Sequence, residues 1–561
     1  MIHDWHPKCL IPVQIHPQKL PRITKNPSTI THMRTLTFDN RLTRELPQDP
    51  IKPVYQRQVA NALWSMAQPT PVKNPQLLAY SPDVANLLGL TPADMQDSEL
   101  IQTLGGNGAL AGMMTYATRY GGHQFGHWAG QLGDGRAIYL GELIHAGKRF
   151  ELQLKGAGET PYSRSADGRA VLRSSLREFL CSEAMHHLGI PTTRALSLVS
   201  TGDLVRRDMF YNGNPEMEPG AIVCRVAPSF TRPGHFELMA NKGEHHLLKR
   251  FIGFTIDRDF SQWLAATDLP LDQHNPSPEL IEAWFEEICE RTAILMAHWM
   301  RVGFVHGVMN TDNLSIIGLT IDYGPYGWID HFDPEWTPNT TDAQGKRYCF
   351  GRQPDVARWN MERLADALAT LLPDTEGLAD AISHYDHTYI KHLTQSLAGK
   401  FGLGPWQDSD GDLVNRIFEL MTRAEIDMTL FFSKLAELDL AQPSINTISP
   451  AFYTESGLKQ FGSDIQQWLN TYAKRIQQNK QSPKQRIEKM QAYNPRYVLR
   501  NYMAQEAIDC LINDGDNNRL LSLLALLKNP YTQQPGMEQF EQKRPDWARQ
   551  KAGCSMLSCS S

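Results

Sequence analysis

The sequence predicts an α+β fold, in which strands dominate the N-terminal part and helices dominate from about residue 375 onward. Residues 148–155 alternate apolar and polar side chains, as a half-buried strand does, and residues 137–143 form an apolar strand just before them. Residues 412–440 and 501–528 instead carry apolar side chains at helical spacing. Since domains span roughly 100–200 residues, a chain of 561 residues should contain about three or four structural units.

Three further elements are predicted between these regions. Residues 169–188 should form a helix, because their apolar side chains recur on one stripe and Gly189 follows as a stop signal. Residues 222–227 should form a buried strand. Residues 278–302 should form a long amphipathic helix that runs into a loop at Gly303. The chain therefore alternates between the two kinds of element before it becomes mostly helical.

Composition limits the partners. With 55 basic and 61 acidic residues the net charge is −6, which argues against a general nucleic-acid or anionic-membrane binder. The apolar run at 520–527 is far shorter than the roughly 20 residues that cross a bilayer. The eight cysteines include no C-x-x-C pair, which excludes zinc ribbons and thioredoxin-like sites and fits a reducing compartment. We therefore expect a soluble, cytoplasmic protein that binds neither nucleic acid nor membrane.

A glycine turn, a strand lysine and a helix glutamate follow one another in the order found in protein kinases. Gly133 and Gly135 lie in a turn that could bring backbone N–H groups close to phosphates, and Arg136 could clamp phosphate oxygens. Lys155 ends the second strand, and the next helix places Glu178 on its core-facing side, where an unpaired carboxylate would be costly. Such a pair positions phosphates in kinases. Taken alone, the turn is more often a simple hairpin.

The strongest motif is His-Gly-Val-Met-Asn-Thr-Asp-Asn at residues 306–313. His306 and Asn313 keep the spacing of the kinase loop H-R-D-x-x-x-x-N, but Val308 stands where the catalytic Asp should be. Nine residues after Asn313, Asp322 opens an Asp-Tyr-Gly motif similar to the metal-binding Asp-Phe-Gly. Asn313 and Asp322 therefore predict a Mg²⁺ site shared with triphosphate oxygens, and Asp312 is the nearby carboxylate that could replace the missing base. The alternative is a loop with a fortuitous Asp–Asn pair.

Other basic and turn residues could complete a triphosphate site. Arg225 and Arg232 lie seven residues apart on a strand and the loop after it, and Asp167-Gly168 lies in a turn that enters the helix of Glu178. Each is unremarkable alone, because surface arginines are usually solvated and Asp-Gly is a common turn. The two arginines and Lys155 together supply more positive charge than one triphosphate needs when it binds as in an ordinary kinase.

Two histidines share the i, i+4 spacing of helical metal ligands. They are His123 and His127, and no third ligand follows at a sensible spacing. We interpret both as structural, hydrogen-bonding histidines.

Several stretches of the chain stand out as long motifs. One is Tyr-Gly-Gly-His-Gln-Phe-Gly-His-Trp-Ala-Gly-Gln-Leu-Gly-Asp-Gly-Arg-Ala at residues 120–137. The others are residues 154–164, 218–221, 225–228, 234–237, 306–313, 322–325, 494–501 and 558–561. Together these motifs resemble the selenoprotein O family, called YdiU in bacteria. The likeness runs from about residue 35 to the end of the chain. It implies a two-lobed protein-kinase-like fold, a pseudokinase, that binds ATP in a flipped orientation.

The resemblance also implies an activity and a set of roles. Such a protein transfers AMP from ATP to Ser, Thr or Tyr hydroxyls of protein substrates, with Mg²⁺ or Mn²⁺ as cofactor. The residues implied to bind the nucleotide are Gly133, Gly135, Arg136, Lys155, Asp167, Gly168, Glu178, Arg225, Arg232 and Asp322. Asp312 would be the base, and Asn313 and Asp322 would hold the metal. The rival functions are an ordinary phosphotransferase and a catalytically inactive scaffold.

The cysteines near the C-terminus raise the question of redox control. Cys554 and Cys559 lie in a small-residue segment that is expected to be mobile and exposed. Cys559 stands where some relatives carry selenocysteine, and the loop at 336–339 lacks the cysteine that pairs with the tail in some bacterial relatives. Cys349 lies in the same long loop. We therefore predict a reversible disulfide between Cys349 and Cys559.

Four segments are expected. Residues 1–34 carry no helical periodicity. We interpret them as a disordered extension, or as the result of a start codon assigned too far upstream. The alternative is an organelle-targeting segment, which would direct the protein to an organellar matrix. Residues 35–250 should form the N-terminal lobe and residues 251–375 the C-terminal lobe with the catalytic and metal loops. Residues 376–561 should form a helical region that ends in the cysteine-containing tail.

Overall fold

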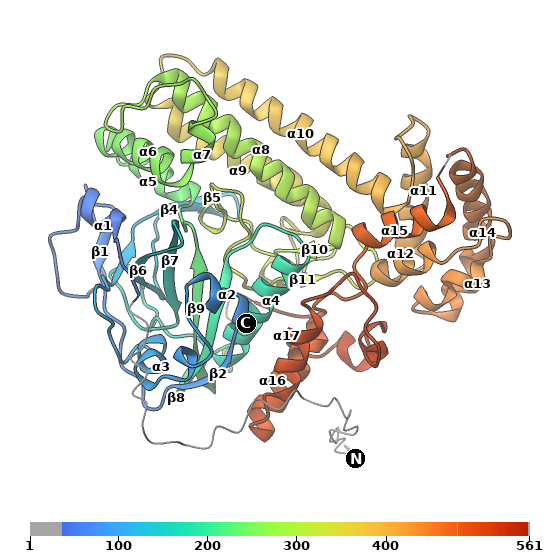
Figure 1. Ribbon diagram of the computed structural model, residues 1–561, viewed down its shortest axis with the longest axis horizontal. Coiled ribbons are helices and arrows are strands. Elements are labelled where there is room, and N and C mark those ends of the chain that lie inside the picture. The colour runs from blue at the N-terminus through green and yellow to red at the C-terminus, as the bar shows by residue number, and fades with distance from the viewer. Residues whose placement is uncertain (1–35, 480, 559–561) are drawn as a thin grey trace. The chain divides into compact units, whose positions relative to one another are not determined.

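A seven-stranded antiparallel sheet forms the centre of the N-terminal part, and most of the helices follow it in sequence (Figure 1). The computed structural model describes residues 36–479 and 481–558. The strands run in the order β1-β3-β6-β7-β9-β8-β2. Their bounds are Trp64–Met66 (β1), Gln76–Tyr80 (β2), Tyr116–Thr118 (β3), Ala137–His145 (β6), Lys148–Lys155 (β7), Arg194–Arg207 (β8) and Glu216–Ala227 (β9). The predicted mixture of a strand-rich first part and a helical second part is confirmed.

Hairpin β6–β7 places the predicted strand lysine. Its turn consists of Ala146 and Gly147, both with positive φ (48° and 74°), the conformation that matches the twist of two paired strands. The register pairs Ala137 with Lys155, so the end of β7 lies beside the start of β6. The sequence predicted the bounds of β7 correctly, whereas β6 runs two residues beyond residue 143 and β9 begins well before residue 222.

Helix α4 (Leu172–His187) covers the sheet with the predicted apolar stripe, because Leu176, Phe179 and Leu180 are fully buried. It begins at residue 172 rather than 169, since residues 169 and 171 form isolated bridges with residues 157 and 220. Gly189 follows the helix with φ 73°, which allows the left-handed turn that ends it.

Helix α8 (Pro278–Val302) has the predicted bounds. Ser277 caps its first turn by accepting a hydrogen bond from the Leu280 N–H, and Gly303 ends it with φ 76°. Helices α9 (Gln353–Ala369) and α10 (Glu376–Lys400) pack along α8 (Figure 1). Two shorter helices, α5 (Pro233–Asn241) and α6 (His245–Asp259), connect the sheet to this layer.

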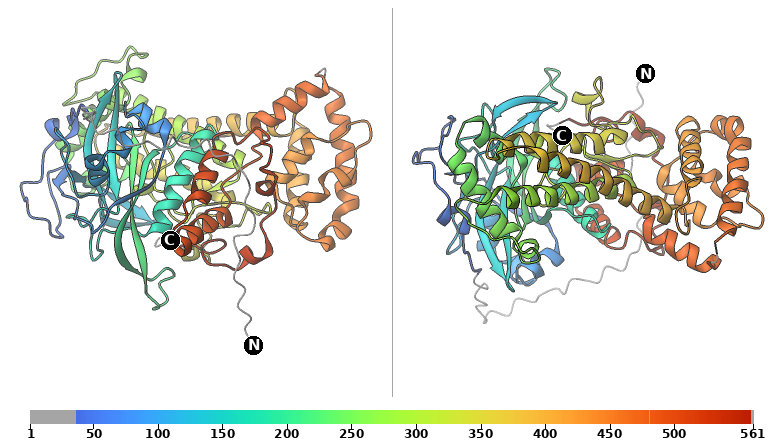
Figure 2. Two further views of the ribbon diagram at one scale, coloured as in Figure 1. Left: turned by 60° about the horizontal axis from the view of Figure 1, so that its bottom comes forward. Right: turned by 90° about the horizontal axis from the view of Figure 1, so that it is seen from above.

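The C-terminal region is helical but more interrupted than the periodicity predicts. The stretch 412–440 divides into α11 (Asp410–Arg423) and α12 (Met428–Ala436), because Glu425 has φ 50° and Asp427 caps the second helix. The stretch 501–528 divides at Gly515 into α16 (Asn501–Asp514) and α17 (Asn518–Leu526). The other long helices are α14 (Glu455–Gln477) and α15 (Pro483–Tyr493). Helices α16 and α17 return to pack on α4 (Figure 2).

The segment before the C-terminus is packed as far as residue 558. Cys554 and Leu557 are buried, and the Leu557 carbonyl accepts hydrogen bonds from the N–H and Oγ1 of Thr340, at 2.8 and 2.9 Å. The expectation of a mobile, exposed tail is therefore wrong for this part. Cys559 and residues 1–34 lie outside the described residues, and Cys349 is buried. The predicted disulfide stays a prediction.

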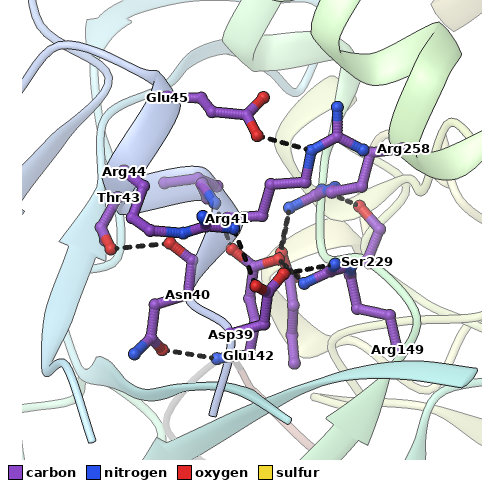
Figure 3. A network of polar contacts seen from close by, with 12 residues as sticks. Asp39, Asn40, Arg41, Thr43, Arg44, Glu45, Glu142, Arg149, Ser229 and Arg258 are labelled. Carbon is purple, nitrogen blue, oxygen red and sulfur yellow. Dashed lines mark hydrogen bonds and ion pairs between the residues drawn. The ribbon is translucent and has the colours of Figure 1, made fainter. Parts of the chain in front are cut away.

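An ion-pair network joins the sheet to helix α6 and to the segment just before helix α1 (Arg41–Glu45). The half-buried Arg149 contacts the buried Glu142 at 3.0 Å and the half-buried Asp39 at 2.6 Å (Figure 3). The buried Arg258 of α6 contacts Glu151 on β7 at 2.8 Å. Because charges removed from water are costly unless they are paired, this network helps to hold both segments on the sheet. Among the described residues no helix is both long and apolar enough to span a membrane.

Candidate active site

The predicted ion pair between strand lysine and helix glutamate is present. Lys155 at the end of β7 and Glu178 in α4 are both buried, and Lys155 Nζ lies 2.5 Å from Glu178 Oε2. Burial lowers the pKa of Lys155, and the charge of Glu178 opposes that effect. The pair is therefore held by the two elements that pack together to form the core.

Two arginines converge on the carboxylate of Asp322. Arg225, on β9 beside β7, lies 2.6 Å from Asp322 Oδ1 and 3.3 Å from Glu178 Oε1. Arg232, at the N-terminus of α5, contacts Asp322 Oδ2 and donates to the carbonyl of Asp312. Burial alone would raise the pKa of Asp322, but Arg232, Arg225 and Lys155 hold it far below its ordinary value. These contacts bring five of the predicted residues into one cluster: Lys155, Glu178, Arg225, Arg232 and Asp322.

Asp322 also has a strained backbone. Its φ of 57° lies in the left-handed region, which residues other than glycine rarely adopt. Such strain persists only where the surroundings impose it, and it is concentrated at functional sites. Here the two arginines and the preceding residue impose it, because the Ile321 carbonyl accepts a hydrogen bond of 2.7 Å from His306 Nε2.

Asp312 lies in a short 3-10 turn, Thr311–Asn313, and its side chain is buried. Its Oδ2 accepts a hydrogen bond of 3.1 Å from Gln124 Nε2, whereas its Oδ1 is buried with no hydrogen-bond partner among the described residues. Burial raises the pKa of Asp312 to about 7. A carboxyl group with such a pKa can accept a proton near neutral pH, which is what a general base requires.

The loop around Asp312 is fixed by His306 and Asn313. His306 stacks on Trp299, with ring centroids 5.4 Å apart, and burial lowers its pKa, which favours the neutral imidazole. Asn313 Nδ2 donates to the carbonyl of Val308 at 3.1 Å, which sets the direction of the amide group. Residues 306–313 thus form a folded loop in which hydrogen bonds fix the imidazole of His306 and the amide of Asn313.

The glycine turn has a different structure from the predicted hairpin. The strands on its two sides belong to different sheets: β5 (His127–Gln131) pairs with β4 (Gly121–Gln124), and β6 pairs with β3 and β7. A Cβ on Gly133 would lie 2.5 Å from the Tyr162 ring, and one on Gly135 would lie 2.9 Å from the Tyr162 carbonyl oxygen. The close packing of residues 133–135 on Tyr162 therefore already requires glycine at both positions.

Arg136 lies near the buried cluster, whereas Asp167 lies outside it. The Arg136 carbonyl accepts a hydrogen bond of 2.7 Å from Gly156 N–H, which places Arg136 at the Lys155 end of β7. Asp167 is exposed and pairs with Arg207 at 2.6 and 2.8 Å. Gly168, with φ 65°, packs on the Gly156–Gly158 stretch, since its carbonyl accepts from Gly158 N–H at 3.1 Å. This stretch links Gly168 to Lys155.

The residues predicted to bind metal fit a hard cation in type. An amide oxygen of Asn313 and a carboxylate of Asp322 are ligands that Mg²⁺ accepts, usually together with water and phosphate oxygens. In the part of the chain that the structure describes, no three His, Cys, Asp or Glu side chains gather as a metal site. A cation at this position would therefore take its other ligands from the nucleotide, and Asp322 would have to exchange an arginine for it.

The two histidines are not on a helix. His123 and His127 lie on opposite strands of hairpin β4–β5, so their spacing is not that of helical metal ligands. His123 Nδ1 lies 2.5 Å from Glu237 Oε2 in α5, as expected of a structural histidine. His127 is exposed.

Sequence reasoning missed two glutamines that contact the site. Gln124 donates to Asp312, and Gln153 on β7 accepts from Arg225. Neither carries a charge or stands at a fixed spacing from its partner, so no local signal distinguishes them. The register of β7 with β9, which pairs Gln153 with Arg225, is the information that the sequence does not display.

Comparison with known proteins is consistent with this site. The family model "Protein adenylyltransferase SelO" matches residues 52–528. A "Protein nucleotidyltransferase YdiU" of Methylobacillus flagellatus is 58% identical over 527 residues, which cover 94% of this chain and all of the relative. Relatives with the same name from Tolumonas auensis and Xanthomonas axonopodis pv. citri are 57% and 55% identical over 529 and 533 residues, again over their whole length and over 94% and 95% of this chain. The chain belongs to the SelO family of protein adenylyltransferases.

Proposed function

We propose that this protein transfers AMP from ATP to Ser, Thr or Tyr hydroxyls of other proteins and releases pyrophosphate. One observation supports this most directly. Lys155, Arg225 and Arg232 gather around Glu178 and Asp322, and Arg232 joins this cluster to the loop 306–313. Asp312 is the only carboxylate of that loop, because Val308 occupies the kinase base position. An ordinary kinase would lack its base, and an inactive scaffold would not need a buried carboxyl group with a pKa of about 7.

The proposed fold assignment is a two-lobed, protein-kinase-like fold. Residues 35–250, with the main sheet, the Lys155 strand and α4, would be the N-terminal lobe. Residues 251–375, with α8 and the loops of Asp312 and Asp322, would be the C-terminal lobe, and residues 376–561 a helical addition. The order of the paired lysine and glutamate, the 306–313 loop and the Asp-Tyr-Gly motif supports this division.

The cluster offers several cations to a triphosphate. Lys155, Arg225 and Arg232 are paired with the carboxylates of Glu178 and Asp322, and Arg136 lies close by. Burial raises the pKa of the two neighbouring carboxyl groups, Asp134 and Asp312, which favours their neutral forms. Electrostatic interactions are stronger in such a buried space than in water, and a triphosphate would compete with Glu178 and Asp322 for these cations. Gly133 and Gly135 would form the turn beside it, and Asp167 and Gly168 the outer edge of the site.

The proposed reaction joins the acceptor oxygen to the α-phosphorus. Asp312 Oδ1 would take the proton of the acceptor hydroxyl while the new P–O bond forms and the bond between the α- and β-phosphates breaks. The leaving pyrophosphate gains negative charge, and Lys155, Arg225 and Arg232 would stabilise it, which lowers the barrier. Asn313 and Asp322 would hold Mg²⁺ or Mn²⁺, which would neutralise phosphate charge.

The position of the label in ATP tests the reaction. We expect protein acceptors incubated with the enzyme, Mg²⁺ and α-labelled ATP to become labelled, and those incubated with γ-labelled ATP to stay unlabelled. Label from the γ-position would show a phosphotransferase, and label from neither would favour the scaffold. Asp312→Ala should lose α-label transfer and keep ATP binding, because a base acts on the chemical step.

A further inference from the structure

We propose that Gln124 is the positioning residue of Asp312, and that hairpin β4–β5 serves to hold it there. The inference rests on the proposed role of Asp312 as the base and adds a residue to it. A base acts efficiently only when its reactive oxygen is held in one place, since small displacements of a catalytic group cost much of the rate. The surroundings of Asp312 show how that place is set.

The hairpin contacts three successive residues of the loop. Gln124 Nε2 donates to Asp312 Oδ2 at 3.1 Å, and the His123 N–H donates to Thr311 Oγ1 at 2.7 Å. The Phe125 N–H donates to Asn310 Oδ1 at 3.1 Å. The contacts of His123 and Phe125 hold the loop next to Asp312, whereas the contact of Gln124 is made with the carboxylate of Asp312 itself.

The two oxygens of Asp312 are thereby made different. Oδ2 is occupied by the amide of Gln124, whereas Oδ1 is buried without a hydrogen-bond partner among residues 36–479 and 481–558. Oδ1 lies against Gly122, where an added Cβ would come within 2.9 Å of it. One oxygen is thus anchored, and the other is left as the acceptor for a proton. Because a carboxylate only accepts, the Gln124 amide must present its N–H₂ group here.

The hairpin is fixed on its other side by α5. His123 Nδ1 lies 2.5 Å from Glu237 Oε2, and a Cβ on Gly234 would lie 2.1 Å from the Gly121 carbonyl oxygen. Close packing of two glycines and a short polar contact leave β4 little freedom to move. Gln124 is therefore held by a rigid element, as a residue that orients another residue must be.

Three variants test this role through the rate of α-label transfer to a fixed amount of a protein extract. Gln124→Met keeps the length of the side chain but cannot donate, and we expect kcat to fall by about 10- to 100-fold. Gln124→Glu places a second carboxylate against Oδ2 and should lower kcat at least as much. The KM for ATP and the affinity for ATP should stay unchanged in both. His127→Ala, an exposed position on the same hairpin, is the matched control and should keep the wild-type kcat.

The design separates this inference from the proposed function. Where Asp312→Ala retains a measurable residual rate of α-label transfer, adding Gln124→Met should not lower that rate further, because a positioning residue has nothing left to position. Full transfer by Asp312→Ala would overturn the proposed base, and this inference with it. Wild-type kcat in Gln124→Met beside an inactive Asp312→Ala would overturn the inference alone. A parallel loss of ATP affinity in Gln124→Met would also overturn it, since it would mean a structural role.

Discussion

His235 should make the protein less stable as the pH falls below neutral. The imidazole is buried between Tyr120 and Phe251, and its Nδ1 accepts a hydrogen bond of 3.1 Å from the Arg232 N–H. Burial, followed by the charge of Arg232, lowers the pKa of His235 from its ordinary value of 6.5 to about 3. The unfolded chain therefore binds a proton near pH 6.5 that the folded chain refuses until about pH 3.

The magnitude follows from that difference. Between pH 6.5 and about 3 the free energy of unfolding should fall by about 1.4 kcal/mol for each pH unit from this group alone. Between pH 7.5 and 5.5 His235 lowers the free energy of unfolding only over the one pH unit below 6.5, so this free energy should fall by about 1.4 kcal/mol. Urea unfolding followed by tryptophan fluorescence at both pH values measures it. In His235→Gln, which keeps an acceptor for the Arg232 N–H, the loss should be smaller by that amount.

The comparison has a matched control. Burial also lowers the pKa of the buried His306 and of the less buried His298, His186 and His187, but these groups are the same in the variant and cancel. His127→Gln makes the same substitution at an exposed position, and the loss of stability measured in it is the reference for His235→Gln. Equal losses of stability in wild type and His235→Gln would refute the reasoning.

Three more outcomes are expected. Asp322→Ala should abolish α-label transfer. It should also lower Tm, because it leaves the buried Arg225 and Arg232 without their shared carboxylate, and added ATP should restore part of the lost Tm. Unchanged transfer would mean that the metal is held elsewhere. Glu178→Gln should lower the free energy of unfolding by about 3–5 kcal/mol, because it leaves Lys155 buried beside a neutral amide. It should also weaken ATP binding, and calorimetry measures both effects. An unchanged ATP affinity would mean that the Lys155–Glu178 pair takes no part in nucleotide binding. Peptide mapping of oxidised protein should find Cys559 joined to Cys349, and finding Cys559 only as a free thiol would remove that prediction.

Elements with their own start and stop signals could be predicted from the sequence. Helix α8 is one, since Ser277-Pro278 begins it and Gly303 ends it. Strand β7 is another, since its alternation predicts a strand with the correct bounds; the expectation that this strand is half-buried is wrong, because Glu151 and Gln153 are buried too. The Lys155–Glu178 pair could also be predicted, because a carboxylate on a core-facing helix side needs a partner. The signals for α8 and β7 are local in the sequence, and the signal for the ion pair is the high cost of burying an unpaired carboxylate.

Features set by tertiary contacts could not be predicted. The break at Glu425 places a residue other than glycine at positive φ, which no composition signal marks. The glycine turn joins strands of two different sheets, and sequence adjacency alone favoured a hairpin. The Asp322 carboxylate is held by Arg225 and Arg232, which come from β9 and from the start of α5. That meeting depends on strand register and helix placement.

Helix α5 connects the two chemical halves of the site. At its N-terminus Arg232 joins the carboxylate of Asp322 to the backbone of Asp312. One turn further on, Glu237 holds the hairpin whose Gln124 contacts the Asp312 carboxylate. A single nine-residue helix thus supports both a cation of the proposed phosphate site and the residue that orients the proposed base. A movement of α5 would change both distances together, so the charge that binds the leaving group and the group that accepts the proton are set by one rigid element.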